Sequence, residues 1–163
     1  MKSLLILGAG GFGQMIKETA LALGYEKVVF LDDAAKSDDV IGMCCDYVLR
    51  HSEYPVAVAA FGNNKTRLFW TDKLIAEGYE VPAIVHPSAI VSPSAVLEAG
   101  CFVMQRAVVN THTRVERAAL INSGAVVDHD SVVCAGAHIG LGSVVKANCT
   151  IEAGQKVEAG EVI

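Results

Sequence analysis

Branched apolar residues recur at every sixth position through the second half of the chain. The series runs through Ile84, Ile90, Val96, Phe102 and Val108, and after one extra residue it resumes as Val115, Ile121, Val127, Val133, Ile139, Val145, Ile151, Val157 and Ile163. Four places after most of these come small residues: Ser88, Ser94, Gly100, Ala119, Ala125, Ser131, Ala137, Ser143 and Cys149. A period of six fits neither a helix nor a simple strand, so the chain must turn once per repeat. We predict an all-β parallel β-helix of hexapeptide repeats over residues 83–163, with about 18 residues per coil.

The first half follows a different pattern. Ser3–Leu7 and Lys27–Leu31 are predicted to be buried strands on either side of a helix from Gly13 to Leu23. Another strand is expected from Val56 to Phe61, followed by an amphipathic helix from about Lys65 to Glu77. Three of the four prolines then cluster where the pattern changes. We therefore expect a small Rossmann-like α/β domain with a mostly parallel sheet over residues 1–82.

Composition and charge narrow the class of protein. Only 6% of the 163 residues are aromatic although 52% are hydrophobic, so the core must use small and branched side chains. A net charge of -5 disfavours a nucleic-acid partner. The apolar segment Leu4–Leu7 is far shorter than the roughly 20 residues that span a bilayer, and no signal-peptide pattern is present. We expect a cytoplasmic protein without membrane insertion.

Glycines follow the first predicted strand in a pattern typical of phosphate binding. Gly8, Gly10, Gly11 and Gly13 satisfy GxGxxG and open a helix, where free backbone amides can meet a phosphate. Asp32 and Asp33 follow the second strand, at about the distance where a carboxylate meets a ribose or base. The alternative is that the glycines only pack the turn against the sheet. About 80 residues hold less than a full dinucleotide fold, which favours a nucleotide or a nucleotide sugar.

A second polar segment follows the strand at Val56–Phe61. Asn63 lies at the carboxyl end of that parallel strand, the edge where such sheets bind ligands, and Arg67 one turn later is a candidate for a phosphate contact. Asn64 could equally be the N-cap of the following helix.

The segment Asp128-His129-Asp130 carries the candidate catalytic chemistry. A histidine between two carboxylates can act as a general base near neutral pH, although a surface histidine in an acidic turn is the simpler alternative. His138 lies half a coil further on, and His112 is expected to be a corner residue in the irregular step of the hexads. These three histidines occupy different hexad positions, and the five cysteines lack CxxC spacing, so we predict no metal site and no disulfide framework.

Taken together, these segments resemble the PglD/NeuD-type sugar acyltransferases. The resemblance rests on ILGAGGFG (6–13), FLDD (30–33), AFGNNKTR (60–67), IVHPSAIVSPSA (84–95) and INSGAVVDHDSVV (121–133), together with the one-residue slip in the hexads. It implies a nucleotide-sugar-binding α/β domain joined to a left-handed β-helix. It also implies a homotrimer whose active sites lie between subunits.

The resemblance further implies transfer of acetyl from acetyl-CoA, as acyl-donor substrate, to a UDP-linked 4-amino-sugar. The family's histidine base and its acid fall on His129 and Asp130, although the acid is usually glutamate. His138 matches a second family histidine near the thioester. The acyl-CoA is expected near Gly140, Gly142 and Ala147, and the family's nucleotide contacts fall on Gly8, Gly10, Gly11, Gly13, Asp32 and Asp33.

Two other functions stay open from the sequence. One is O-acetylation of a sialic acid or another hydroxyl acceptor, which would use the same histidine. The other is a non-catalytic nucleotide-sugar-binding subunit with a degenerate acyl-CoA site. The second follows from the expectation that relatives have several more coils than follow His129 here, which predicts fewer contacts to the adenine end of CoA.

Overall fold

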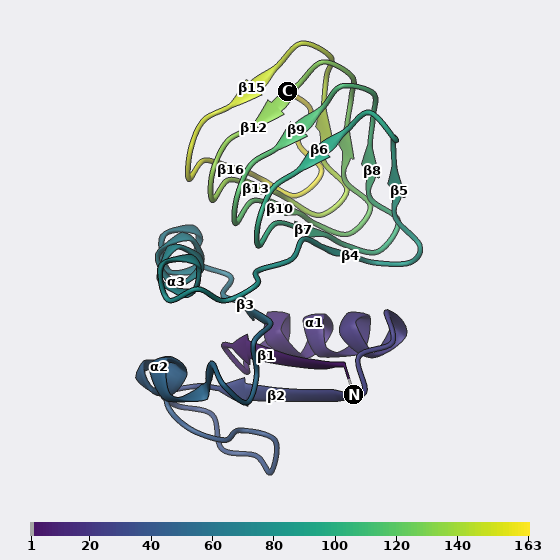
Figure 1. Ribbon diagram of the computed structural model, residues 1–163. Coiled ribbons are helices and arrows are strands. Elements are labelled where there is room, and N and C mark those ends of the chain that lie inside the picture. The colour runs from purple at the N-terminus through teal and green to yellow at the C-terminus, as the bar shows by residue number, and fades with distance from the viewer. Residues whose placement is uncertain (1) are drawn as a thin grey trace. The chain divides into compact units, whose positions relative to one another are not determined.

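The computed structural model describes residues 2–163. Two compact units make up the chain, and the boundary between them falls between Pro82 and Ala83 (Figure 1). The first unit is α/β and the second is a parallel β-solenoid.

The first unit is built around a small parallel sheet of order β2-β1-β3. Its elements are β1 (Ser3–Leu7), α1 (Gly11–Ala22), β2 (Lys27–Leu31), a 3-10 turn η1 (Cys44–Asp46), α2 (Tyr47–Arg50), β3 (Ala57–Ala59) and α3 (Asn64–Ala76). The last four residues of β1 and of β2 are buried, as expected for parallel strands covered on both faces. The carboxyl ends of these strands place the glycine turn and the two aspartates at one edge of the sheet.

Several predicted elements of this unit are confirmed, with shifts at their ends. β1 and β2 have the predicted bounds, whereas β3 is shorter than the predicted strand and α1 begins two residues earlier. The short helical segment η1–α2 was not predicted. It spans less than two helical turns and has no periodicity that a sequence pattern could reveal.

The second unit coils through three parallel sheets. Its strands are two residues each: β4 (Ile84–Val85), β5 (Ile90–Val91), β6 (Val96–Leu97), β7 (Phe102–Val103), β8 (Val108–Val109), β9 (Arg114–Val115), β10 (Leu120–Ile121), β11 (Val126–Val127), β12 (Val132–Val133), β13 (His138–Ile139), β14 (Val144–Val145), β15 (Thr150–Ile151) and β16 (Lys156–Val157). Each strand from β4 to β13 pairs with the strand three places further on, for example Val103 in β7 with Ile121 in β10. Three hexads therefore complete one coil, which confirms the predicted coil length.

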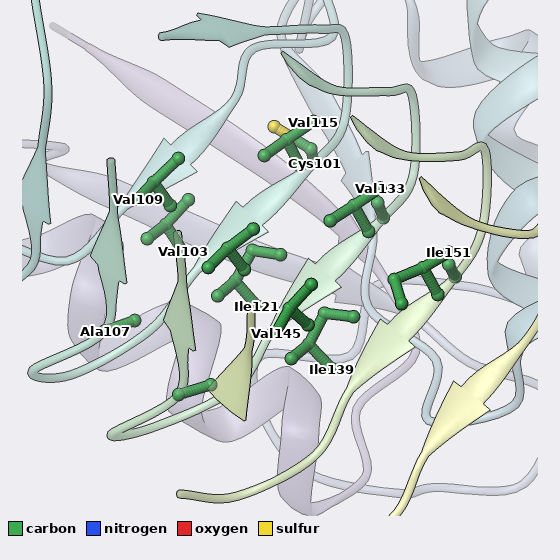
Figure 2. Close-up of a cluster of buried hydrophobic side chains, with 14 of the residues drawn as sticks. Cys101, Val103, Ala107, Val109, Val115, Ile121, Val133, Ile139, Val145 and Ile151 are labelled. Atoms are coloured by element: carbon green, nitrogen blue, oxygen red, sulfur yellow. The ribbon is translucent and has the colours of Figure 1, made fainter. Parts of the chain in front are cut away.

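The inward-facing column runs through the solenoid without interruption, so the predicted one-residue slip is wrong. It steps by six through Val85, Val91, Leu97, Val103, Val109, Val115, Ile121, Val127, Val133, Ile139, Val145, Ile151 and Val157. Figure 2 shows side chains of this column converging on a common interior from three sides. Regular pairing from β4 to β16 leaves no place for an inserted residue.

The error in register has a simple cause. The strands β4 to β8 each carry two adjacent apolar residues. The series predicted from Ile84 to Val108 follows the first residue of each pair, which points away from the interior. Ile90 is 66% exposed and Val96 is 52% exposed. Ile84 and Phe102 are buried, but they lie outside the interior cluster that contains Val103 and Val109. Since the side chains of a strand alternate, only the second residue of each pair fills the core.

The small residues of the core form a second column, two places before the first. Its members are Ala83, Ala89, Ala95, Cys101, Ala107, Thr113, Ala119, Ala125, Ser131, Ala137, Ser143 and Cys149. Ser88 and Ser94, two of the small residues of the predicted series, lie at corners outside this column, where their Oγ atoms accept hydrogen bonds from the backbone N–H groups of Arg106 and His112. Gly100 is also a corner residue, with φ +65°.

Each corner from residue 100 onward is turned by one residue in the left-handed region. These residues recur every six positions: Gly100, Arg106, His112, Ala118, Gly124, Asp130, Gly136, Gly142, Asn148, Gly154 and Gly160. Glycine adopts this conformation without steric cost, and aspartate and asparagine tolerate it better than most residues. His112 is therefore a corner residue as predicted, but it belongs to a regular series.

Candidate functional site

His129 and Asp130 form a hydrogen-bonded pair at a corner of the solenoid. The Nδ1 atom of His129 lies 2.7 Å from Oδ2 of Asp130. Asp130 therefore reaches the ring, although the resemblance implies the longer glutamate at this position. A neutral imidazole that donates from Nδ1 keeps its lone pair on Nε2, the atom available to accept a proton.

Neighbouring coils hold the backbone of this pair. The corner follows β11 and precedes β12. The N–H of Asp130 donates to the carbonyl of Thr111 at 3.0 Å, and the carbonyl of His129 accepts from the N–H of Asn148 at 3.1 Å. Because one coil below and one coil above are both bonded to the corner, the histidine stands on a fixed backbone with its side chain 51% exposed.

Asp128 acts on His129 differently from Asp130. Its Oδ1 accepts from the backbone N–H of His129 at 2.8 Å and from Nδ2 of Asn110 at 2.9 Å, so it does not hold the ring. The pKa of His129 is raised above 6.5, first by the hydrogen bond to Asp130 and then by the negative charges of Asp128 and Asp130. The pKa of Asp130 is lowered, mainly by the same hydrogen bond. Asp130, and not Asp128, orients the imidazole.

His138 lines a shallow cavity on another face of the solenoid. Its Nε2 lies 3.1 Å from Nδ2 of Asn122. The cavity has a volume of about 160 Å³ and is also lined by Gly140, Leu141, Lys156, Glu158 and Ala159. The structure therefore brings together His138 and Gly140, two of the four residues predicted at the acyl-CoA site. The same surface carries the exposed side chain of Leu141 and the ion pair between Lys156 and Glu158.

The other two predicted acyl-CoA residues lie at corners outside this cavity lining. Gly142 has φ +61°, and Ala147 stands one coil after His129. Gly140 is fixed by packing, since a Cβ there would lie 2.5 Å from the carbonyl oxygen of Val157. Its lack of a side chain is thus explained by the next coil.

The glycine turn of the first unit combines open and crowded positions. A Cβ on Gly10 or Gly11 would meet no atom within 4 Å, whereas one on Gly8 or Gly13 would collide with backbone atoms. Gly8 also has φ +97°. Gly8 and Gly13 are therefore required by the turn itself, and the open side of the turn is at Gly10 and Gly11.

Asp32 secures this turn. Its Oδ2 accepts from the N–H of Ala9 at 2.7 Å, and its Oδ1 accepts from the N–H groups of Ala34 and Ala35. These three hydrogen bonds outweigh the opposing effect of partial burial and lower the pKa of Asp32. Asp33 accepts from the N–H of Cys44 at 2.8 Å. Both aspartates line an open cavity of about 410 Å³ together with Lys36, Ser37, Val40 and Met43.

The expected phosphate contact of Arg67 is wrong. Its guanidinium is fully buried and donates to the carbonyls of Phe61 and Gly62 and to Oδ1 of Asn64. Burial lowers its pKa to about 10. Asn63, not Asn64, is the N-cap of α3, because its Oδ1 accepts from the N–H of Thr66 at 3.0 Å. Arg67 thus stabilises the β3–α3 connection from inside.

A third residue at the corner of His129 and Asp130 was not predicted from the sequence. Nδ1 of His112 lies 3.3 Å from Oδ1 of Asp130. The spacing of His112 and Asp130 is one coil of 18 residues, which indicates that they stack. The one-residue irregularity predicted at His112 obscured this spacing. Among residues 2–163, no three His, Cys, Asp or Glu side chains are grouped in a way that could hold a metal ion. None of the helices in that range has the length and apolarity needed to cross a membrane.

Comparison with known proteins decides the family. Residues 3–74 match the PglD N-terminal domain family. The acetyltransferase domain of PglB from Neisseria gonorrhoeae FA1090 is 33% identical over 100% of this chain and 91% of that chain, with a TM-score of 0.89. The chain belongs to the PglD/NeuD-type sugar acyltransferases. It is therefore an enzyme of the acyltransferase class.

Other structures of PglD/NeuD-type proteins contain ligands. The PglB domain has been solved in complex with acetyl coenzyme A, with 33% identity and a TM-score of 0.87 over 98% of this chain and 89% of that chain. PerB from Caulobacter crescentus, solved with CoA and GDP-perosamine, is 28% identical over 100% of this chain and 89% of that chain, with a TM-score of 0.89. This chain thus spans about nine-tenths of each, so the expectation that relatives are longer by several coils is wrong for these two.

Proposed function

We propose that this protein is an acetyl-CoA-dependent N-acetyltransferase of a nucleotide-linked amino sugar, with His129 as general base. The observation that carries the proposal is the 2.7 Å hydrogen bond from His129 to Asp130 on an exposed corner. Support comes from similarity along the whole chain to structures solved with acetyl coenzyme A and with CoA and GDP-perosamine.

In the proposed reaction, the amino group of the acceptor attacks the thioester carbonyl carbon of acetyl-CoA. Nε2 of His129 takes a proton from the nitrogen as the new C–N bond forms, and the carbonyl becomes a tetrahedral oxyanion. When this intermediate collapses, the C–S bond breaks and the CoA thiolate leaves. The imidazolium returns the proton to the thiolate, and Asp130 stabilises the imidazolium in between.

The acyl donor is proposed to lie along the solenoid between the catalytic corner and His138. Gly142 and Ala147 offer no bulky side chain to obstruct a pantetheine arm, and the cavity at His138 and Gly140 would receive part of the donor. Leu141, which is 53% exposed, supplies an apolar surface there. This assignment needs only the coils described.

The nucleotide is proposed to bind the first unit, which we interpret as a Rossmann-like domain. Gly10 and Gly11 leave the amides at the start of α1 open to a phosphate. The carboxylate of Asp32 is already bonded to three backbone amides, so its part is to shape the turn. Asp33 and the 410 Å³ cavity beside it are the proposed contact for the ribose, base or sugar. We expect UDP as the nucleotide and test GDP beside it.

We further propose a cytoplasmic homotrimer of left-handed β-helices with active sites shared between neighbouring subunits. The outward apolar side chains of Ile90 and Val96, which are 66% and 52% exposed in the single chain, favour coverage by another copy. Sedimentation velocity tests this assembly, and a stable monomer would exclude the shared site.

The catalytic proposal is tested by following release of free CoA thiol from acetyl-CoA. The acceptor panel holds UDP- and GDP-linked amino sugars, free sialic acid and serine. We expect turnover with a nucleotide-linked amino sugar and a loss of about 100-fold or more in His129→Ala. Arg117→Ala is the matched control, because Arg117 is an exposed residue at the equivalent position of another hexad.

Each remaining outcome has a definite meaning. Unchanged turnover in His129→Ala would exclude this histidine as the base. Turnover with sialic acid alone would replace the N-acetyltransferase with an O-acetyltransferase. Absence of turnover with every acceptor, combined with binding of a nucleotide sugar in calorimetry, would support a non-catalytic subunit.

A further inference from the structure

The left-handed corners on the edge of His129 differ from those on the other two edges. Because each coil consists of three hexads, the corners stack in three columns. One column is His112, Asp130 and Asn148; the others are Arg106, Gly124, Gly142 and Gly160, and Gly100, Ala118, Gly136 and Gly154. Glycine predominates in the last two columns, whereas the column beside His129 has none.

A side chain in the left-handed region carries a backbone cost that glycine avoids. Histidine tolerates the region better than most residues but still less well than glycine. Arg106 and Ala118 each accept this cost once on the other two edges, whereas three consecutive coils carry a side chain on the edge of His129, with φ of +58°, +56° and +60°. The uninterrupted run of side chains at these corners directs attention to what the side chains contact.

The contacts join His112 to the catalytic pair through Asp130. Oδ2 of Asp130 accepts from Nδ1 of His129 at 2.7 Å, and its other oxygen, Oδ1, lies 3.3 Å from Nδ1 of His112. One carboxylate therefore lies between two imidazoles from successive coils. The backbone of His112 is itself anchored, because its N–H donates to Oγ of Ser94 at 3.1 Å.

We propose that His112 is a positioning residue for acetyl transfer, which holds the carboxylate of Asp130 so that it keeps the proton of His129 on Nδ1. This inference rests on the proposed function, since it concerns the same base. His112 acts through Asp130 and does not touch the reacting atoms.

Orientation, not stability, is the expected contribution. The side chains of His112 and Asp130 are 67% and 48% exposed, and exposed pairs of this kind add little to folding free energy. A carboxylate held by only one partner can rotate, and the neutral imidazole can then carry its proton on either nitrogen. Each molecule with the proton on Nε2 lacks a base facing the acceptor.

Three substitutions of His112 separate the effect of its hydrogen-bond donor from the effects of side-chain shape and of backbone strain. His112→Asn keeps an N–H donor three bonds from Cα, as Nδ1 is, and tolerates the left-handed region. His112→Asp has the same shape and tolerance but presents an acceptor to Asp130. His112→Gly removes the side chain and relieves the backbone cost.

The experiment combines nitrogen-15 NMR of the His129 ring with steady-state kinetics. We expect the wild type and His112→Asn to hold neutral His129 mainly as the Nδ1–H tautomer, with kcat values within about 2-fold of each other. His112→Asp and His112→Gly should give mixed tautomers and lower kcat by about 3- to 10-fold with KM unchanged. Unchanged tautomer populations and kcat in both would overturn the inference.

The two readouts also separate this inference from the proposed function. The tautomer of His129 is measured without substrate, so it tests the contact of His112 even if the wild type acetylates no acceptor. A wild type that acetylates an amino sugar, with His112→Gly equal to it in tautomer and rate, would leave the function standing and remove the role of His112. Thermal unfolding of all three variants checks that the solenoid is intact.

Discussion

The carbonyl oxygen of Gly8 lies 2.0 Å from the point where a Cβ on Gly13 would stand. No side chain can occupy that point, because a Cβ atom and a carbonyl oxygen that are not bonded to each other do not approach this closely. The close approach brings the start of α1 against the end of β1. The last glycine of the turn is therefore dictated by helix–strand packing, independently of any ligand.

We expect Gly13→Ala to destabilise the protein by about 3 kcal/mol, since the backbone of Gly8 must move to admit the methyl group. Gly11→Ala is the matched control. Its Cβ meets no atom within 4 Å, and alanine favours a helix, so stability should rise by up to about 1 kcal/mol. Urea unfolding measures both, and equal stability of the two variants would contradict the packing explanation.

Arg67 is expected to be structural. Arg67→Ala leaves the carbonyls of Phe61 and Gly62 and the side chain of Asn64 without this donor inside the unit, so we expect a loss of about 2 to 4 kcal/mol. Lys65→Ala, on the exposed side of the same helix, should change stability by less than about 0.5 kcal/mol. A stable Arg67→Ala variant with weakened nucleotide-sugar binding would restore the phosphate contact that the structure argues against.

The rate of acetyl transfer should depend on the charge of Asp130 in a defined direction. His129 is a base only when neutral, so activity falls as pH drops through its pKa, which Asp130 raises above 6.5. Asp130→Asn removes the main support of the imidazolium. We therefore expect the acidic limb of kcat/KM to move to lower pH and the plateau to fall by about 10-fold.

Asp128→Asn is the comparison for that experiment. It also removes one negative charge near the ring but leaves the ring's own hydrogen bond in place. Its acidic limb should move in the same direction and by less. A larger shift in Asp128→Asn than in Asp130→Asn would show that Asp128, and not Asp130, controls the imidazole.

The corrected register of the hexads predicts which branched residues support the solenoid. Ile121 is fully buried in the inward column, whereas Ile90 is 66% exposed. Ile121→Ala should lower the free energy of unfolding by about 2 to 5 kcal/mol, and Ile90→Ala by less than about 1 kcal/mol. Chemical denaturation at several protein concentrations checks this, because the loss within one subunit does not depend on concentration, whereas the subunit contact proposed for Ile90 adds a loss that does. A loss in Ile90→Ala as large as that in Ile121→Ala at every concentration would contradict the corrected register.

The sequence predicts the six-residue repeat of the solenoid, but it does not show which residue of each hexad faces the interior. The repeat of six residues is the same whichever position of the hexad is counted, so the sequence alone predicts the length of a coil. Pairs such as Ile90-Val91 and Val96-Leu97 are apolar at both positions, and hydrophobicity alone does not say which one faces inward. The alanines two places before the inward column carry that information, because small residues occupy the core positions next to the corners, where the chain turns close to the interior.

The hydrogen-bonded pair of His129 and Asp130 could be proposed from the sequence because it is local, whereas the contacts that support it are not local. Asp128, His129 and Asp130 are consecutive, and their chemistry suggests a base without knowledge of the fold. His112 contacts Asp130 from the preceding coil, 18 residues earlier in the sequence. The guanidinium of Arg67 is buried because it packs beneath the connection between β3 and α3. Both need coordinates, since exposure and long-range pairing are properties of the folded chain.

The constant coil length also determines how such a chain can gain or lose residues. Removing one whole coil shortens the solenoid by one turn, and every later residue stays on the same one of the three sheets. Removing a single hexad preserves the inward columns just as well, but every later residue moves to the next face. We therefore expect a chain that lacks one hexad between His112 and Asp130 to fold with an intact core, but with His129 and Asp130 on a different edge of the solenoid from His112.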